Sequence, residues 1–386
     1  MSIEFVKGAP SELEAIVAFA NDVFSSETEK TDFSSLLPKL YRNGSDTEQY
    51  HYLAKENGRI VAAVLSYPLE AVIAGRKFSV RPIGTVSVHR DYRGRGLMQA
   101  LIARALEDME REGVAFTLLS GQRQRYEYFG YEPCMQRLSC TVTRDNLRHA
   151  FPGLPTGRVS LRPLAPGDTE LLQAAHRLQE RRPFYVLRPG RRFYDICCSW
   201  NARPFAVLKD GAFAGYLVAS PDGAEICELE LSDASALPEL LARHLAFFGR
   251  YSAELLLAPF ETGRMAALDA FCDGMTAGIS ESLHIFSYPD LIRQLLLLKA
   301  SYAPLRDGTL VFGIGERVRF RIAVAGEKIA VDLTDEPADF SLPEFQALRF
   351  LFSAVSPLYT YEPHALPGCA ASWFPLPFYW PPADQV

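Results

Sequence analysis

The chain has 386 residues, of which 48% are hydrophobic and 22% charged, an average composition for a soluble globular protein and far from that of a disordered chain. Its formal net charge of -6 at pH 7 lacks the basic excess that a nucleic-acid or membrane partner would require. At about 150 residues per domain, we expect two or three folded domains.

The sequence has no pattern that indicates export, a membrane span or a metal site. Residues Met1 to Phe5 lack the basic start and apolar stretch of a signal peptide, and no apolar run is long enough to span a bilayer. We therefore expect a cytoplasmic protein. The seven cysteines form no Cys-x-x-Cys pair and no histidine lies at zinc-finger spacing, so we expect reduced thiols and no metal site.

The N-terminal part alternates strand and helix patterns. Ser11, three residues before Glu14, fits a capping box for the first helix. Asn57-Gly58 between two apolar runs predicts a hairpin, and apolar residues at helical spacing predict a helix over 94–111. The other elements expected here are strands over 3–7, 52–55, 59–66, 78–88, 114–119 and 138–142, and a helix over 33–41.

A similar order recurs from residue 158, and a small α+β unit follows residue 288. We expect a mixed α+β and α/β protein with domains over 1–147, 148–287 and 288–386. The expected elements of the third unit are helices over 290–299 and 342–352 and strands over 309–314, 317–324 and 329–333. The tail from Ser372 to Val386 is so aromatic that it should pack against the body.

The segment from Val86 to Met98 joins a strand end, a turn of alternating arginine and glycine, and a helix start. Glycines allow backbone amides to approach a ligand closely, and a helix N-terminus favours anions. Arg93 and Arg95 can add bidentate contacts to phosphate. The pattern therefore predicts a pyrophosphate site, although many solvated turns have a similar composition.

This segment resembles the coenzyme motif of the GCN5-related N-acetyltransferase (GNAT) superfamily, with Arg93, Gly94, Arg95, Gly96 and Leu97 matching and Met98 in the place of the usual small residue. The resemblance implies tandem GNAT folds, with mostly antiparallel sheets flanked by helices, and acetyl-CoA as co-substrate. It further implies that Val86, Ser87 and Val88 lie along the pantetheine arm and that backbone amides from Gly94 to Met98 hold the pyrophosphate.

A second stretch, Tyr126-Glu127-Tyr128-Phe129-Gly130-Tyr131, is similar to the Tyr-x-x-Phe-Gly-Tyr motif of the same enzymes, whose first tyrosine is the general acid. A phenol of pKa about 10 stays protonated at neutral pH and can protonate a departing thiolate of pKa about 8.5. The alternative for Tyr126 is an ordinary tyrosine at the edge of a core.

The whole architecture resembles that of the Eis-type acetyltransferases. The resemblance implies a second, degenerate GNAT domain without coenzyme, because Ser232-Asp233 replaces the Gly/Arg turn. It also implies a third domain like sterol carrier protein 2, a trimer or hexamer, and a terminal carboxylate, here that of Val386, as general base. The alternatives are a frayed terminus and, as the base, Glu70, His89 or Glu127.

We expect an acetyl-CoA-dependent N-acetyltransferase that modifies a primary amine, such as an aminoglycoside, polyamine, amino sugar or lysine, by direct attack in a ternary complex. No Ser-His-Asp or Cys-His arrangement suggests an acyl-enzyme. Two other hypotheses stay open: a non-catalytic acetyl-CoA sensor or assembly module, and a lipid carrier that acts through the third domain.

Overall fold

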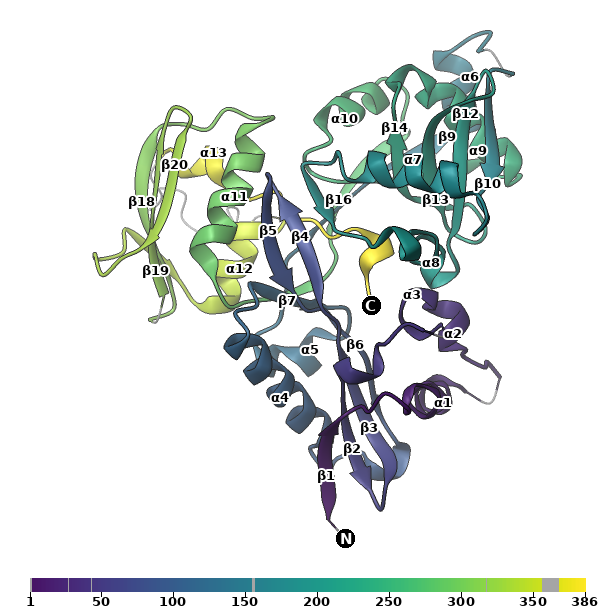
Figure 1. Cartoon of the computed structure of the whole chain (residues 1–386). Coiled ribbons are helices and arrows are strands. Elements are labelled where there is room, and N and C mark those ends of the chain that lie inside the picture. The colour runs from purple at the N-terminus through teal and green to yellow at the C-terminus, as the bar shows by residue number, and fades with distance from the viewer. Residues whose placement is uncertain (1, 27, 43, 155–156, 317, 356–367) are drawn as a thin grey trace.

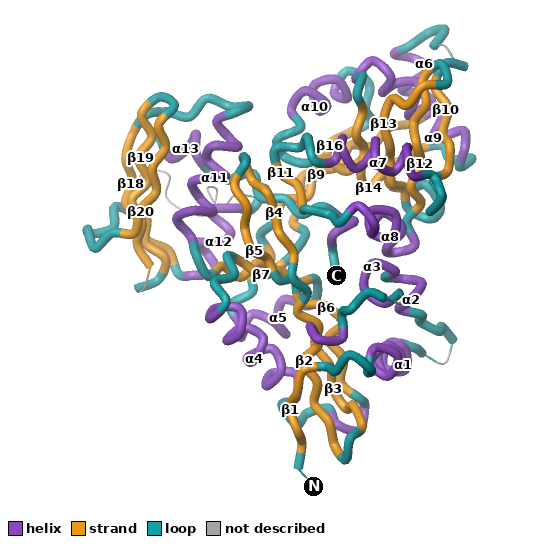
Figure 2. Tube along the Cα trace, viewed as in Figure 1, coloured by secondary structure: helices purple, strands orange, loops and turns teal. Residues whose placement is uncertain are grey.

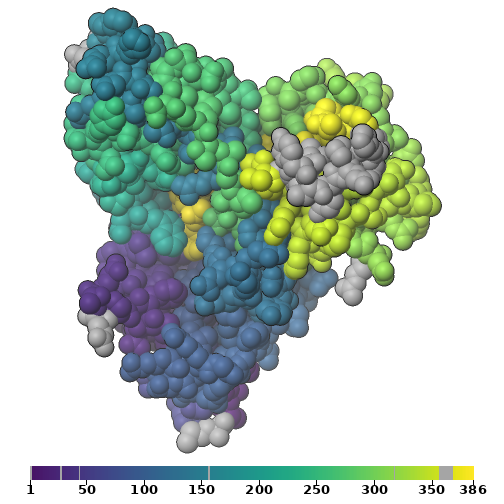
Figure 3. All heavy atoms as spheres, turned by 180° about the vertical axis from the view of Figure 1, so that it is seen from behind, coloured from purple at the N-terminus to yellow at the C-terminus, as the bar shows by residue number. Residues whose placement is uncertain are grey.

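The protein is described by a computed structural model over residues 2–26, 28–42, 44–154, 157–316, 318–355 and 368–386. Three lobes follow one another along the chain and meet near the centre of the molecule, as Figure 1 and the opposite view in Figure 3 show. Each lobe combines helices with strands (Figure 2), which confirms the mixed fold class.

The first lobe begins with a four-stranded antiparallel sheet, called sheet A, in the order β1-β2-β3-β6. Leu53 packs with Ile16 of helix α1, whereas its neighbours Tyr52 and Ala54 pack with Leu101 of helix α4. Because side chains alternate along a strand, the two helices cover opposite faces of the sheet. These elements are β1 (Ile3–Lys7), α1 (Leu13–Phe24), β2 (His51–Glu56), β3 (Arg59–Ser66), β6 (Ile83–Val88) and α4 (Leu97–Arg111).

Two expected elements of this lobe are each broken at a proline. The strand expected over 78–88 divides into β5 (Arg76–Val80) and β6, and Pro82, which cannot donate to a strand ladder, lies between them. The helix expected over 33–41 divides into α2 (Phe33–Leu36) and α3 (Pro38–Tyr41), where Pro38 occupies the first helical position.

The capping box expected at Ser11 was also wrong. Helix α1 is preceded by Glu12, whose carboxylate accepts the backbone N–H of Ala9 at 2.9 Å. The hairpin expected at Asn57-Gly58 is confirmed, since β2 and β3 pair antiparallel on either side of it.

Strands of the first two lobes pair in each other's sheets. Strand β9 (Gln136–Thr143) pairs with β15 (Ser252–Leu257) in the seven-stranded sheet C of the second lobe, and β17 (Ser282–Ile285) pairs with β7 (Phe116–Leu119) in the six-stranded sheet B of the first. Sheet C runs β10 (Val159–Pro163), β12 (Arg203–Lys209), β13 (Ala212–Ala219), β14 (Glu225–Leu231), β15, β9, β16 (Gly274–Ile279). Sheet B runs β11 (Phe184–Val186), β4 (Leu69–Ile73), β5, β7, β17, β8 (Glu132–Pro133).

Short helices complete these two lobes. They are α5 (Arg123–Tyr126), α6 (Arg144–Ala150), α7 (Thr169–Gln179), α8 (Phe193–Cys198), α9 (Leu237–Phe247) and α10 (Thr262–Asp269).

The third lobe has a small sheet, in the order β20-β19-β18-β21, packed against helices. Its interior is filled by aromatic rings: Phe312 stacks on Phe320 and Phe350 with ring centroids 5.5 and 5.6 Å apart. The elements are α11 (Tyr288–Ala300), β18 (Gly308–Ile314), β19 (Val318–Ala325), β20 (Lys328–Leu333), β21 (Phe340–Leu342), α12 (Glu344–Phe352) and α13 (Ala370–Trp373). Residue 317, the first of the strand expected over 317–324, lies outside the described residues.

The aromatic tail packs against the body, as its composition predicts. Phe378 and Trp380 are buried, and the ring of Phe378 lies 5.1 Å from that of Phe116. The backbone N–H of Gln136 donates to the Phe378 carbonyl at 2.8 Å. The tail thereby runs from the third lobe to the junction of the first two, where the chain ends (Figure 1).

Candidate functional site

The loop from β6 to α4 has the backbone shape that its glycines allow. Gly94 and Gly96 have φ angles of +75° and +73°, in the left-handed region that favours glycine. Gly96 is the residue before α4, and no side chain caps the helix there. The first backbone N–H groups of the helix are therefore available to an anion.

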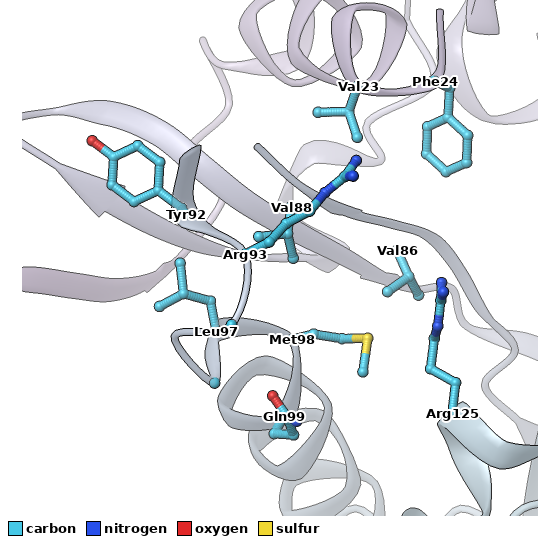
Figure 4. A pocket seen from close by; sticks show the side chains of 12 residues that line it. Val23, Phe24, Val86, Val88, Tyr92, Arg93, Leu97, Met98, Gln99 and Arg125 are labelled. Atoms are coloured by element: carbon cyan, nitrogen blue, oxygen red, sulfur yellow. The ribbon is translucent and has the colours of Figure 1, made fainter. Parts of the chain in front are cut away.

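A cavity of about 460 Å³ lies beside this loop (Figure 4). Arg93 from the loop and Arg125 from α5 flank Val88 and Val86 of β6, and Val23 and Phe24 of α1 approach from the other side. The lining residues are Val23, Phe24, Val86, Val88, Tyr92, Arg93, Gly94, Gly96, Leu97, Met98, Gln99 and Arg125.

Two of the residues expected at the coenzyme site have side chains turned elsewhere. Ser87 is buried, and its hydroxyl donates to the Thr85 carbonyl at 3.2 Å. Arg95 lies over the ring of Tyr92, 4.9 Å from the ring centroid, and 3.9 Å from a carboxylate oxygen of Glu56. These two residues can contribute through their backbone.

The charges of the two cavity arginines are not compensated. Within the described part of the chain, neither Arg93 nor Arg125 has a carboxylate within ion-pair distance, whereas the neighbouring Arg123 pairs with Glu132 at 2.9 Å. A second cavity of about 590 Å³ adjoins the first through Val23 and Arg93. The cavity arginines therefore give this region a positive potential suited to phosphate.

Strand β6 is the last strand of sheet A and bears a bulge. Its residue Thr85 has φ +47°, and the register with β3 shifts at this point. The hydroxyl of Tyr41 lies 2.5 Å from that of Thr85 and 3.1 Å from Nε2 of His51, whose Nδ1 lies 2.9 Å from the Thr47 carbonyl. Burial lowers the pKa of His51 to about 4, so the ring is neutral at pH 7. This buried chain of hydrogen bonds fixes the bulge in the pairing of β6 with β3. Because β6 is the edge strand of sheet A, its other side has no strand partner in that sheet among the described residues.

Tyr126 closes α5 and is buried, with its ring against Gly121. Burial raises the pKa of its phenol, which keeps the hydroxyl protonated at neutral pH. The residue lies next to Arg125 but does not itself line the cavity.

The end of the chain lies against β6. A methyl group placed on Gly84 would be 2.7 Å from the terminal carboxyl carbon of Val386. One residue earlier, Gln385 donates to Glu281 at 2.6 Å, and the other oxygen of Glu281 accepts the hydroxyl of Ser120, at the end of β7. The terminus is thus placed between β6 and the segment that leads to Tyr126.

The other candidate bases are placed differently. Glu70 is exposed and lies 3.8 Å from Lys77, and Glu127 lies 3.5 Å from Arg123. His89 lines the second cavity, and its Nδ1 accepts the backbone N–H of Asp91 at 3.3 Å.

Several residues around the site were not predicted from the sequence. Arg125 lines the cavity, but it belongs to α5 and lies outside the segment from Val86 to Met98 that predicts the coenzyme site. Gly84, Lys39 and Glu281 were not identified, because they lie in separate elements and meet the tail only in the fold. A glycine inside a strand does signal the close approach of another backbone, and Gly84 could have been found in that way.

The described residues contain neither a candidate membrane span nor a candidate metal site. No helix is both long and apolar enough to cross a membrane in the ranges that the structure covers. Among those same residues, no group of three or more His, Cys, Asp and Glu side chains could hold a metal ion.

Comparisons with known proteins agree with this geometry. Residues 5–134 match the family described as an acetyltransferase (GNAT) domain, while no curated protein matches the chain in sequence. Eis1 from Mycobacterium abscessus has a TM-score of 0.66 at 16% identity, with 100% of both chains covered. A GCN5-related N-acetyltransferase from Kribbella flavida has a TM-score of 0.64 at 16% identity, covering 100% of this chain and 98% of its own. A probable N-acyltransferase from Enterococcus faecalis V583 has a TM-score of 0.67 at 16% identity, covering 98% of this chain and 97% of its own.

These solved structures share the fold over the whole chain, and the family match covers the loop, the cavity and Tyr126. The chain therefore contains an acetyltransferase (GNAT) domain over residues 5–134 and shares its overall fold with the solved structure of Eis1.

Proposed function

We propose that the protein transfers an acetyl group from acetyl-CoA to a primary amine by direct attack within a ternary complex. The observation that carries this proposal is the contact of the terminal carboxyl group of Val386 with Gly84 of β6. Val86, two residues further along the same strand, lines the cavity. A base and a coenzyme site then share one strand.

The residues present fit acetyl-CoA. The unpaired side of β6 offers backbone groups at Val86, Ser87 and Val88 to the amides of the pantetheine arm. Backbone N–H groups from Gly94 to Met98 would bind the pyrophosphate. Arg93 and Arg125 would add charge-assisted contacts that Arg95, held by Glu56, does not make.

In the proposed reaction, the amine nitrogen forms a bond to the thioester carbonyl carbon, and the carbon–sulfur bond breaks. An amine of pKa about 10.4 costs roughly 4.6 kcal/mol to deprotonate at pH 7, so a base is needed. The Val386 carboxylate would take that proton, and the phenol of Tyr126 would give one to the leaving thiolate. We also propose that the protein is cytoplasmic and assembles into a trimer or a hexamer.

Calorimetric titration with acetyl-CoA tests the coenzyme site. We expect that the Arg93→Ala/Arg125→Ala variant binds at least about 100-fold more weakly, because a hydrogen bond to a charged group contributes about 1.5–3 kcal/mol. Arg95→Ala is the matched control and should bind about as tightly as the wild type. Thiol release with a panel of amines then tests transfer. Equal losses in both variants, or no coenzyme binding by the wild type, would refute the assignment.

A further inference from the structure

Three groups from different parts of the chain hold the last residues of the tail. The Lys39 ammonium, on α3, donates to the carbonyl of Ala383 at 2.6 Å and also to that of Gln385. The side chain of Gln385 donates to Glu281, and the indole N–H of Trp200 donates to the Gln385 carbonyl at 3.2 Å. The residue before the terminus is therefore fixed from three directions.

A buried ion cluster fixes Asp384 in the same segment. Arg188 has no exposed side-chain surface and donates to both oxygens of Glu228, at 2.8 and 2.7 Å, and to Asp384 at 2.8 Å. Burial disfavours the ionised form of Glu228, but the Arg188 guanidinium outweighs it and holds the pKa below its usual value. Such clusters cost several kcal/mol of desolvation per ion, so their net stabilisation is small, and a role in fixing geometry is the better explanation here.

Lys39 contacts the same segment without an ion pair of its own among the described residues. It is buried, and within the described residues no carboxylate lies within ion-pair distance of its ammonium. Burial lowers the pKa of Lys39 to about 7, and the charge of Asp384 partly offsets that effect. Arg188 thus binds two carboxylates, whereas Lys39 binds backbone carbonyls, one of them in the residue before the terminal carboxylate.

We propose that Lys39 and the Arg188–Asp384 pair are positioning residues that hold the Val386 carboxylate against Gly84 for proton abstraction. The inference rests on the proposed function, in which that carboxylate is the base. Lys39 belongs to the first lobe, and Arg188, two residues after β11 of sheet B, binds Glu228 of β14 in the second lobe, so the junction of the two lobes, and not the first lobe alone, sets the position of the base.

Steady-state kinetics of Lys39→Met and Lys299→Met test the inference. Lys299 is a matched control, because its ammonium also donates to two carbonyls of the tail, those of Trp373 at 3.1 Å and Pro375 at 3.0 Å, far from the terminus. We expect Lys39→Met to lower kcat about 10- to 100-fold, since a displacement of about 1 Å can cost 100-fold. The KM for acetyl-CoA should not change, and Lys299→Met should keep kcat within about twofold.

A second variant avoids the risk that a buried substitution prevents folding. Gln385→Ala removes the half-buried contact to Glu281 and should lower kcat without changing the KM for acetyl-CoA. Equal kcat values for Lys39→Met, Gln385→Ala and Lys299→Met would overturn the positioning role. A chain with one glycine appended after Val386 separates the two hypotheses. If this chain loses activity while Lys39→Met does not, the positioning role alone fails, and if this chain keeps full activity, the carboxylate is not the base and both fail.

Discussion

Gly84→Ala is the sharpest test of the terminal carboxylate. The backbone of Gly84 is not in the left-handed region, so alanine is compatible with its conformation, and the effect of the substitution is steric. The added methyl group would lie 2.7 Å from the terminal carboxyl carbon, 3.0 Å from its oxygen and 3.1 Å from Cγ2 of Val386. Carbon atoms normally approach to about 3.5–4.0 Å, so the terminus must move by about 1 Å.

A displacement of that size can cost about 100-fold in rate, and we expect kcat to fall by about that factor. The dissociation constant of acetyl-CoA should not change, because Gly84 does not line the cavity and Val86 is the first residue of β6 that does. Thiol release measures the first quantity and calorimetry the second. Gly263→Ala is the control, since a methyl group at that residue meets no atom within 4 Å. If Gly84→Ala keeps the kcat of this control, the carboxylate of Val386 is not the base.

Two more predictions concern Tyr126 and His51. Tyr126→Phe should lower kcat by about 10²–10⁴-fold without changing acetyl-CoA affinity, because the phenol would act as general acid; unchanged turnover in the thiol-release assay would contradict this role. The pKa of His51 is about 4 in the folded protein and about 6.5 when unfolded, so the unfolded state binds more protons between these values. Stability that is present above pH 6.5 should therefore be lost as the pH falls towards 4. In urea unfolding, the wild type should lose about 3 kcal/mol more than His51→Gln between pH 7 and 4, and parallel losses would disprove the assignment.

Local features of the site could be predicted from the sequence because local residues determine them. Gly94 and Gly96 dictate the loop, and the apolar stripe of α4 dictates which face is buried. The breaks at Pro38 and Pro82 are equally local, because the missing proline N–H interrupts a helix or strand even where the hydrophobic periodicity continues.

Contacts between distant segments could not be predicted in the same way. Arg188 meets Glu228, 40 residues later, and Asp384, 196 residues later, and no spacing rule connects such positions. Strand β9 follows the catalytic motifs in the sequence but pairs in the sheet of the second lobe, because the pairing of strands depends on the whole fold. The orientation of Arg95 depends likewise on Glu56, in a different strand.

A terminal carboxylate is a poor base if the end of the chain frays, as chain ends usually do. Fixing the backbone of one residue costs about 1–2 kcal/mol, so ordering Asp384 to Val386 costs roughly 3–6 kcal/mol. A hydrogen bond that involves a charged group contributes about 1.5–3 kcal/mol, and Lys39 supplies two such contacts to this end of the tail and Glu281 one. Three such contacts are enough to offset the cost. Gly84 then provides the space that the ordered terminus fills, so the proposed base depends on both lobes and on the tail together.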